Sequence, residues 1–372
     1  MYTDIKKKAK ELHDKIIVID AHDHIMLDIE KKRAMGERAV FSRYYAPKVK
    51  AGGVNMLCIV VGADSPNCCA HSDLLLWGTM RIMNMLLQEA EESSDTIALC
   101  YNYQQIEEAI KADKIAVIMT LEGARPLEGK PNLDTMDTLQ MLYRLGLRQV
   151  QMCDMGRSRV GDGVSAYRTK SKLTPFGIEM VQECNRLGIV IDTAHMNNEG
   201  FDDVIEISTQ PIIDSHSSCS AVAEWGHNIS DDRIRKLSKN GGVLCVSCYD
   251  LSVGGQEIIE TNYRPTVEDQ INHIDHVVQV GGIDMISIGS DHMPYDEYGD
   301  YRLIDHCFYP VPGYMEGVVH IGVRNSYYVD GIDDVSGFGL ITEGLVKRGY
   351  KDEDIAKIMG LNLLRVYKQV LK

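Results

Sequence analysis

Six imidazole or carboxylate side chains in this sequence stand at the ends of apolar, strand-like runs. They are His22, His24, Glu122, His195, His216 and Asp291, and the runs before them are IIVIDA, IAVIMTL, IVIDTA, PIIDS and MISIGS. A parallel barrel opens the carboxyl ends of all its strands onto one face, so residues far apart in sequence converge there on one or two cations. One such residue alone would more often be a cap or a core hydrogen-bond partner. The repetition predicts the ligand set of a two-metal hydrolase.

Short β-branched runs alternate along the chain with longer amphipathic segments. The eight predicted strands are Ile16–Asp20, Val54–Val61, Ile115–Leu121, Arg148–Cys153, Ile189–Thr193, Pro211–Asp214, Gly242–Cys248 and Met285–Gly289. The predicted helices include Leu74–Glu92, Thr135–Leu145, Pro175–Leu187, Asp231–Lys239 and Thr266–Val280. This alternation predicts an α/β fold with right-handed crossovers, and eight repeats favour a closed (β/α)8 TIM barrel over an open sheet.

A doubly wound open sheet is the alternative fold for such an alternation. It would not explain ligands at the ends of the first, third, fifth, sixth and eighth strands, whereas the rim of a barrel does. No glycine-rich phosphate-binding fingerprint follows the first strand, which further disfavours a dinucleotide-binding sheet.

One long segment, 292–330, follows the eighth strand and is rich in Tyr, Asp, Pro and Gly. Loops of this length in compact domains are usually functional or disordered. The aromatic residues that favour a pocket wall or lid are Tyr295, Tyr298, Tyr301, Phe308, Tyr309 and Tyr314. Residues 336–372 predict two closing helices at the C-terminal end. We expect a single domain over residues 1–372, because barrels of this size run as one unit.

The composition is that of a soluble enzyme. The 372 residues are 44% hydrophobic and carry a formal net charge of -15, which argues against a general nucleic-acid or anionic-membrane surface. The charged N-terminal stretch lacks the apolar core of a secretion signal, and no apolar run is long enough to span a bilayer. Several of the ten cysteines lie inside strand-like runs, where a reduced thiol behaves as a small hydrophobe. We therefore expect a cytoplasmic protein, with a homodimer as one possibility.

One adjacent cysteine pair lies near a histidine and is a candidate for a second metal site. Cys68 and Cys69 are adjacent and lie in a loop with His71. Two neighbouring thiols do not match the usual spacing of zinc ligands, so we do not predict a second metal site there.

Seven stretches of the chain, spread over nearly its whole length, carry a family resemblance. They are VIDAHDHI, LEGARPL, LTPFGIEMVQECNRLGIVIDTAHM, PIIDSHSSCSAV, NISDDRIRKLSKNGGVLCV, INHIDHVVQVGGIDMISIGSDHMP and GLNLLRVY. The chain resembles the membrane (renal) dipeptidases, peptidase family M19, which are binuclear zinc peptidases among the amidohydrolase-like enzymes. The resemblance implies a (β/α)8 barrel and two zinc ions bridged by Glu122. It implies that His22 and His24 hold one ion, that His195 and His216 hold the other, and that Asp291 hydrogen-bonds the bound water.

Hydrolytic chemistry independently requires such an arrangement. Two cations bridged by a carboxylate and a water lower the pKa of that water, and one of them polarises the scissile carbonyl. A nearby carboxylate then moves the proton. Asp291 is the candidate that accepts it from the attacking water and delivers it to the leaving nitrogen, with Glu122 as the second catalytic carboxylate.

Three departures from the family pattern bear on the substrate. The family has His-x-Asp after the first strand, where this chain has His22-x-His24, so that a neutral ligand replaces an anionic one. The His-x-His pattern is usual at this position in the wider amidohydrolase superfamily. Asp154 stands where the family has a substrate-facing His, and an ionised Asp cannot stabilise an oxyanion. His227 stands where the family uses an Arg on the terminal carboxylate, and it lacks the bidentate fork. We expect ordinary L,L-dipeptides to be poor substrates.

Several other residues have a plain structural alternative. Asp154 and His227 are open between substrate contact and structural role. Arg157 begins a basic loop that is most often simply solvated, although its place after the fourth strand allows it to hold a substrate carboxylate. The residues expected on helix faces rather than in the site are His13, His273 and His276.

The predicted function is that of a zinc-dependent hydrolase that cleaves a small amide bond, most simply in a dipeptide or a dipeptide-like compound. The expected partner is a small-molecule substrate, without nucleic acid or membrane. One alternative keeps both metals but acts on a non-peptide amide, a cyclic amide or a lactone, and is favoured by His24, Asp154 and His227. The other is a non-catalytic descendant that binds a small molecule or metal.

Overall fold

The computed structural model describes residues 2–64, 74–128, 136–166, 168–294 and 328–372. The strands within these ranges are all parallel to their neighbours and are β1 (Ile19–Asp23), β2 (Met56–Ala63), β3 (Ile97–Leu99), β4 (Ile115–Glu122), β5 (Leu147–Gln151), β6 (Val190–Asp192), β7 (Ile213–Ser217), β8 (Val243–Ser247) and β9 (Ile286–Gly289). Eight of them follow one another in the order β1-β2-β4-β5-β6-β7-β8-β9. The predicted (β/α)8 barrel is confirmed.

The ring of strands returns to its start through the segment that follows β9. The Asp291 backbone N–H donates to the His22 carbonyl oxygen over 3.0 Å, and the His24 N–H donates to the His292 carbonyl oxygen over 2.9 Å. These two bonds join β9 to β1. Three predicted ligand or catalytic residues therefore sit on the seam where the barrel closes.

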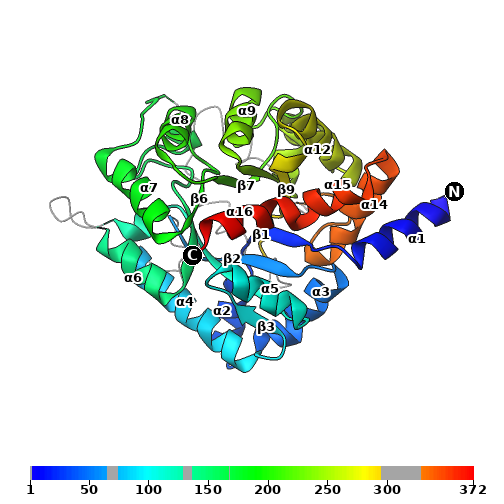
Figure 1. Cartoon of the computed structure of the whole chain (residues 1–372), viewed down its shortest axis with the longest axis horizontal. Helices are drawn as coiled ribbons and strands as arrows, with labels where there is room; N and C mark the ends of the chain where they lie inside the picture. Colours follow the sequence, from blue (N-terminus) through cyan, green and yellow to red (C-terminus); the bar gives the residue numbers. More distant parts are fainter. Residues whose placement is uncertain (1, 65–73, 129–135, 167, 295–327) are drawn as a thin grey trace.

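The helices lie around the barrel (Figure 1). They are α1 (Tyr2–His13), α2 (Met26–Ala34), α3 (Ala46–Ala51), α4 (Leu75–Glu92), α5 (Tyr103–Lys111), α6 (Asp137–Leu145), α7 (Pro175–Leu187), α8 (Asn198–Ile207), α9 (Asp231–Asn240), α10 (Asp250–Gly254), α11 (Gln256–Thr261), α12 (Val267–Gly281), α14 (Phe338–Arg348), α15 (Asp352–Ala356) and α16 (Asn362–Val370). Local sequence sets their limits: Thr174 caps α7 before Pro175, and Gly188 ends it in the left-handed region.

The last helix crosses the strands of the barrel (Figure 1). Its buried side chains pack with residues of one apolar cluster from β1, β2, β4, β6, β7 and β8. Tyr367 reaches furthest, with its hydroxyl 2.9 Å from Cys58 Sγ and donating to Gln149 Oε1 over 2.7 Å. These contacts are at the early residues of the strands, so α16 closes the amino-terminal end and leaves the opposite face for chemistry.

The C-terminal segment is richer than the two helices we predict for residues 336–372. It contains α14, the short helix α15, a wide helical turn and α16.

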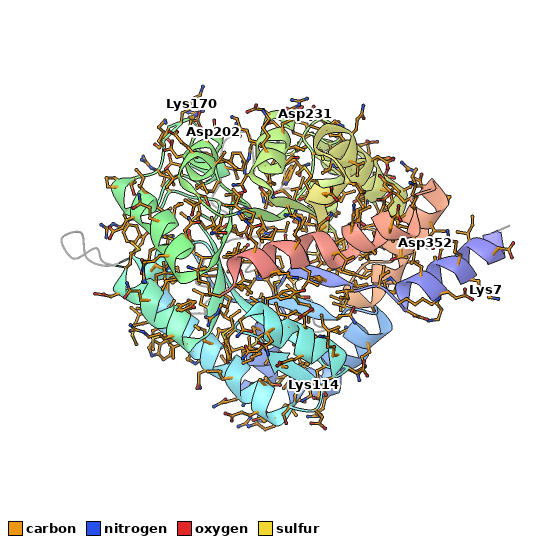
Figure 2. The ribbon with its side chains drawn as sticks, viewed as in Figure 1. Lys7, Lys114, Lys170, Asp202, Asp231 and Asp352 are labelled. Atoms are coloured by element: carbon orange, nitrogen blue, oxygen red, sulfur yellow. The ribbon has the colours of Figure 1, made fainter. Side chains whose placement is uncertain are left out.

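Charged side chains project from the outside of the molecule, among them Lys7, Asp202, Asp231 and Asp352 (Figure 2). Some pair between elements, as Lys236 does with Asp202 at 2.8 Å. Within the described residues, no helix combines the length and apolar character needed to cross a bilayer.

Candidate metal centre

The predicted ligands come from strand ends around the barrel. His22, Glu122 and His216 lie within β1, β4 and β7, close to the carboxyl end of each strand. His24 follows β1 by one residue and His195 follows β6 by three. The prediction that all of them come after their strands is thus wrong for three, because pairing continues through the ligand itself. Their convergence on one face is as predicted.

Glu122 lies at the centre of the group. Its Oε1 atom is 3.5 Å from His22 Nε2, 3.6 Å from His195 Nε2 and 3.8 Å from His216 Nε2. Its other oxygen, Oε2, is 3.5 Å from His24 Nε2. One carboxylate therefore faces four imidazole nitrogens that arrive in two pairs. This is the geometry of a bridging ligand.

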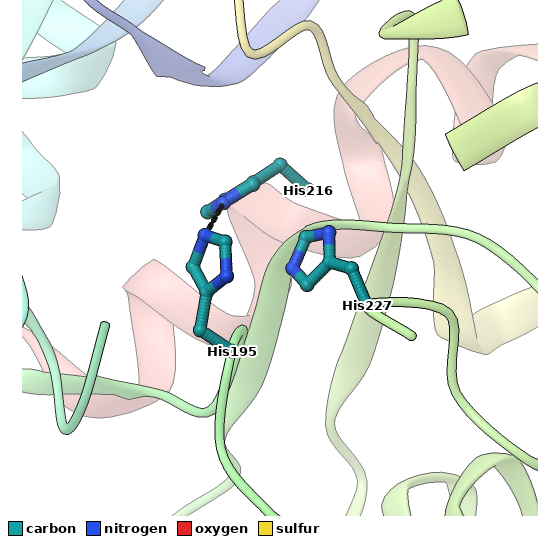
Figure 3. A group of neighbouring side chains, drawn as sticks. All are labelled: His195, His216 and His227. Atoms are coloured by element: carbon teal, nitrogen blue, oxygen red, sulfur yellow. Dashed lines mark hydrogen bonds between the residues drawn. The ribbon is translucent and has the colours of Figure 1, made fainter. Parts of the chain in front are cut away.

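The two imidazole pairs are close enough to share a cation each. The Nε2 atoms of His22 and His24 are 3.1 Å apart, and those of His195 and His216 are 2.9 Å apart (Figure 3). Ligands about 2.0–2.2 Å from a tetrahedral cation stand roughly 3.3–3.6 Å from one another, close to the spacing seen here. Imidazoles and carboxylates without thiolate suit zinc and other divalent cations. The donor set fits two divalent metals.

Asp291 completes the centre on the side of His24. Its Oδ1 atom is 3.5 Å from His24 Nε2 and 3.9 Å from His22 Nε2. The side chain remains 17% exposed, whereas both histidines are buried. Asp291 therefore reaches the cluster from its open side, where a substrate would enter.

Two of these residues adopt a backbone conformation that is unusual for side chains with a Cβ. His195 has φ 63° and Asp291 has φ 58°, both in the left-handed region. Hydrogen bonds hold both turns: the Val164 N–H donates to the His195 carbonyl oxygen over 2.7 Å, and the Tyr328 hydroxyl donates to the Asp291 carbonyl oxygen over 3.1 Å. Strain of this kind persists where surrounding structure enforces it, as at functional sites.

The electrostatics of the cluster follow from burial and from its mixed charges. Burial raises the pKa of Glu122, but His24, His195 and His22 outweigh it and hold that pKa well below its ordinary value. Burial lowers the pKa of His195, yet Glu122 and Asp154 raise it to about 9. The pKa of His216 is well below its ordinary value because of burial and the neighbouring imidazoles. Glu122 is thus held as an anion among imidazole nitrogens, and both kinds of group are donors to divalent cations.

A layer of buried polar groups supports the ligands. Asp20 accepts hydrogen bonds from the Ser290 N–H over 2.8 Å and the Ser290 hydroxyl over 2.5 Å, which ties β1 to the Asp291 turn. Asp192 accepts the Ser215 N–H over 3.0 Å and so connects β6 to the strand that carries His216. Ser215 Oγ lies 2.7 Å from His216 Nδ1 and fixes that ring.

Asp154 and His227 are both brought to the centre. The Asp154 carboxylate groups with Glu122 and His195, with ligand atoms within 4.8 Å of one another. His227 is buried, and its ring stacks on that of His195 with centroids 4.0 Å apart and planes inclined by 17° (Figure 3). Burial, then His195 and Arg233, hold the pKa of His227 well below its ordinary value.

Arg157 does not join the cluster. Its side chain is 65% exposed and its Nε lies 2.9 Å from the buried Asp162 carboxylate. The structure gives it no contact with the described ligands, so its proposed contact with a substrate carboxylate lacks support in the geometry.

The three histidines expected on helix faces serve the structure. His13 packs into the core between the Thr342 hydroxyl and the Gly52 carbonyl oxygen, at 2.7 and 2.8 Å. His273 is buried in α12 and bonded at both ring nitrogens. His276 pairs with Asp231 at 2.7 Å. Cys68, Cys69, His71 and the predicted aromatic lid, apart from its ends, lie outside the described residues.

Sequence reasoning missed several residues of the site. Asp64 is buried behind Asp154 and accepts the Asp154 N–H over 3.3 Å, and burial together with Asp154 raises its pKa well above the ordinary value. Tyr328 holds the Asp291 turn, and its hydroxyl also accepts the Met293 N–H over 2.7 Å. Asp64 directly follows β2, the same signal that identified the ligands, whereas nothing local marks Tyr328.

Comparison with known proteins agrees with this geometry. The profile of the membrane dipeptidase family, peptidase family M19, matches residues 6–301 and 303–372. Dipeptidase verJ of Clonostachys rogersoniana is 28% identical over 296 residues, covering 79% of this chain and 66% of that protein. Human dipeptidase 3 is 28% identical over 285 residues, covering 74% of this chain and 50% of that protein. The chain thus spans between half and two thirds of these curated relatives.

Solved structures agree on the fold. An amidohydrolase from Pseudomonas aeruginosa superposes with a TM-score of 0.78 at 23% identity, covering 98% of this chain and 99% of the other. A metallopeptidase from Rhodobacter sphaeroides, liganded with a phosphinate mimic of the dipeptide L-Ala-D-Ala, gives 0.76 at 19% identity, covering 95% and 99%. The family match covers nearly every residue, and the chain belongs to the membrane dipeptidase family, peptidase family M19.

Proposed function

We propose that this chain is a zinc-dependent hydrolase that cleaves the amide bond of a dipeptide or a dipeptide-like compound. The observation that carries the proposal is the single Glu122 carboxylate set between two imidazole pairs, at 3.5–3.8 Å from all four Nε2 atoms. Membership of the dipeptidase family supports the amide substrate. Zinc is the metal proposed because the donors are imidazole and carboxylate.

The roles of the residues follow from their positions. His22 and His24 would hold one cation, His195 and His216 the other, and Glu122 would bridge both. When bound, divalent cations held by these residues would lower the pKa of the attacking water and polarise the scissile carbonyl. The water oxygen first adds to the carbonyl carbon, and the C–N bond breaks afterwards, once the leaving nitrogen has gained a proton.

Asp291 moves the proton in this scheme. Its carboxylate lies 3.5 Å from the His24 imidazole and is partly exposed, so it can accept the proton of the attacking water and release it to the leaving nitrogen. The nitrogen-bearing half of the substrate then leaves as a neutral amine, and Asp291 returns to its anionic form. Such general acid–base transfer contributes typically about 10²- to 10⁴-fold to rate.

A second candidate function keeps the centre and changes the substrate. His24 supplies a neutral ligand and Asp154 places a carboxylate near Glu122 and His195, which together favour a non-peptide amide, a cyclic amide or a lactone. A non-catalytic descendant is disfavoured because all six residues converge. The proposal also includes a reducing compartment, the cytoplasm, since every cysteine in the described part of the chain is free and buried.

The test is a substrate panel on the purified, zinc-loaded protein, with Asp291→Asn as the matched control. The panel contains dipeptides, dipeptide amides, N-acyl amino acids, cyclic amides and lactones, and the readout is release of product. Cleavage of dipeptides or dipeptide amides that chelation abolishes and zinc restores is expected. Cleavage of only the non-peptide compounds would replace the first candidate with the second, and no metal-dependent cleavage of any would contradict both.

A further inference from the structure

The side of the centre at Asp154 and His227 offers hydrogen-bond acceptors to a substrate. Asp154 Oδ1 accepts the Met155 N–H over 2.6 Å, which fixes the carboxylate, and Oδ2 has no partner among the residues that the structure describes. The carboxylate is only half-buried and stands next to Glu122 and His195. It is therefore oriented toward the place where a substrate binds, with an oxygen available.

The hydrogen bonds around His227 assign its ring N–H to Ser217. Ser217 Oγ has one proton and donates it to Asp214 Oδ1 in a short hydrogen bond. The same oxygen lies 3.4 Å from His227 Nε2, and with the Ser217 proton on Asp214 the tautomer that fits carries its proton on Nε2 and donates it to Ser217. In this tautomer Nδ1 carries a lone pair and offers no donor to a substrate carboxylate.

The guanidinium groups described near the centre are also engaged. Arg233 donates from its terminal nitrogens to the Met196 and Thr193 carbonyl oxygens and to Asp214, at 2.8–3.2 Å. Arg157 is paired with Asp162, and Arg125 donates from Nη1 to the Asp64 carbonyl oxygen over 3.3 Å. Within the described residues, these three guanidinium groups each have a partner, so a substrate carboxylate beside Asp154 would face that carboxylate.

We infer that Asp154 is a specificity-determining residue, and that the substrate presents to it an N–H-donating or positively charged group rather than a free carboxylate. The substrate class is accordingly an amidated or basic dipeptide-like compound. A charge-assisted hydrogen bond gained, or a carboxylate left facing another, changes affinity by roughly ten- to a hundredfold. This inference rests on the proposed function only for the peptide-like skeleton of the substrate. The preference at Asp154 concerns affinity and does not require that the bound compound is hydrolysed.

Binding can be measured without turnover. The probes are three phosphinate analogues of Ala-Ala with one skeleton, ending in a carboxylate, a carboxamide or an amine, because a phosphinate is not hydrolysed. Titration calorimetry on the zinc-loaded full chain is expected to give at least about tenfold tighter binding of the carboxamide and the amine than of the carboxylate. Equal or tighter binding of the carboxylate would overturn the inference, and so would failure of the carboxamide and amine to bind.

Two variants assign the preference to its residue. Asp154→Asn removes the charge and retains an oxygen for the Met155 N–H, so the ratio between amine and carboxylate should fall toward one while metal content stays unchanged. Glu128→Gln is the matched control, since this carboxylate bonds the Arg159 N–H over 2.7 Å and has no described contact with the ligands. Glu128→Gln should keep the ratio of the intact protein. An unchanged ratio in Asp154→Asn would refute the role of Asp154.

Hydrolysis assays separate this inference from the proposed function. If the analogues bind with the expected preference and no dipeptide or dipeptide amide is cleaved, the proposed function fails and the binding preference stands. If free dipeptides are cleaved and the carboxylate analogue binds best, the proposed function stands and the specificity inference fails.

Discussion

Asp291→Asn separates the chemistry of the centre from its architecture. Asn is nearly isosteric with Asp and tolerates the left-handed conformation that φ 58° imposes on this residue. The backbone bonds to the His22 carbonyl oxygen and the Tyr328 hydroxyl do not involve the side chain. The variant should therefore fold and keep its metals, with its free energy of unfolding within about 0.5 kcal/mol of the intact protein.

The expected loss is in turnover. An amide cannot accept the proton of the attacking water, so kcat should fall by at least ~10²-fold, which corresponds to about 3 kcal/mol of transition-state stabilisation. KM should change less, because the amide occupies the same volume beside His24. Asp291→Ala is a useful comparison, since it adds about 1–2 kcal/mol of backbone strain in the left-handed region to the loss of the proton acceptor.

The assay is steady-state hydrolysis of the best substrate from the panel, with metal content and thermal unfolding measured on the same samples. Loss of turnover at full metal content and unchanged stability supports proton transfer by Asp291. Near-normal turnover in Asp291→Asn would assign the transfer to another group. Loss of one metal would instead make Asp291 a ligand.

Three further predictions follow from the described contacts. Glu122→Gln should weaken both cations, because the Glu122 carboxylate lies 3.5–3.8 Å from the Nε2 atoms of both imidazole pairs, whereas His216→Ala should weaken mainly one. Elemental analysis after dialysis checks this, and loss of a single cation in Glu122→Gln would disprove the bridge. His273→Gln should reduce the loss of unfolding free energy that the intact protein shows as pH falls below 6.5. Burial lowers the pKa of His273 to about 4 from 6.5, so its contribution is complete above pH 6.5 and is lost as pH falls toward 4, by about 3 kcal/mol. Denaturant unfolding at pH 7 and pH 4.5 measures it, and identical pH dependence in the variant would contradict the assignment. Tyr328→Phe should lower kcat with metal content unchanged, because it frees the Asp291 turn, and unaltered kcat would show that the turn holds without this hydroxyl.

The barrel was predictable from the sequence because its strands are buried, apolar runs that alternate with amphipathic helices. All eight predicted strands have a counterpart in the structure, with β2 and β4 running to Ala63 and Glu122, one or two residues beyond the predicted ends. The strand β3 was not predicted: Ile97–Leu99 is only partly buried, unlike the equally short β6, and pairs only with the first residues of β4.

The convergence of the candidate ligands was predictable because they follow a rule of topology: each stands at the end of its strand or just past it, and β1 contributes two. Contacts that depend on side-chain direction were not. Arg157 has the charge and the position of a residue on the active face, yet its guanidinium pairs with Asp162. Tyr328 is far from Asp291 in sequence, and only the packed structure brings its hydroxyl to that turn.

We propose that one buried carboxylate, that of Glu122, joins two cation sites in this chain. The most direct measurement is the number of divalent metals bound per chain, by elemental analysis of protein purified without chelators and then dialysed against zinc and metal-free buffer. The intact protein should bind close to two per chain, and Glu122→Gln should bind fewer than one. One metal or none in the intact protein would contradict it.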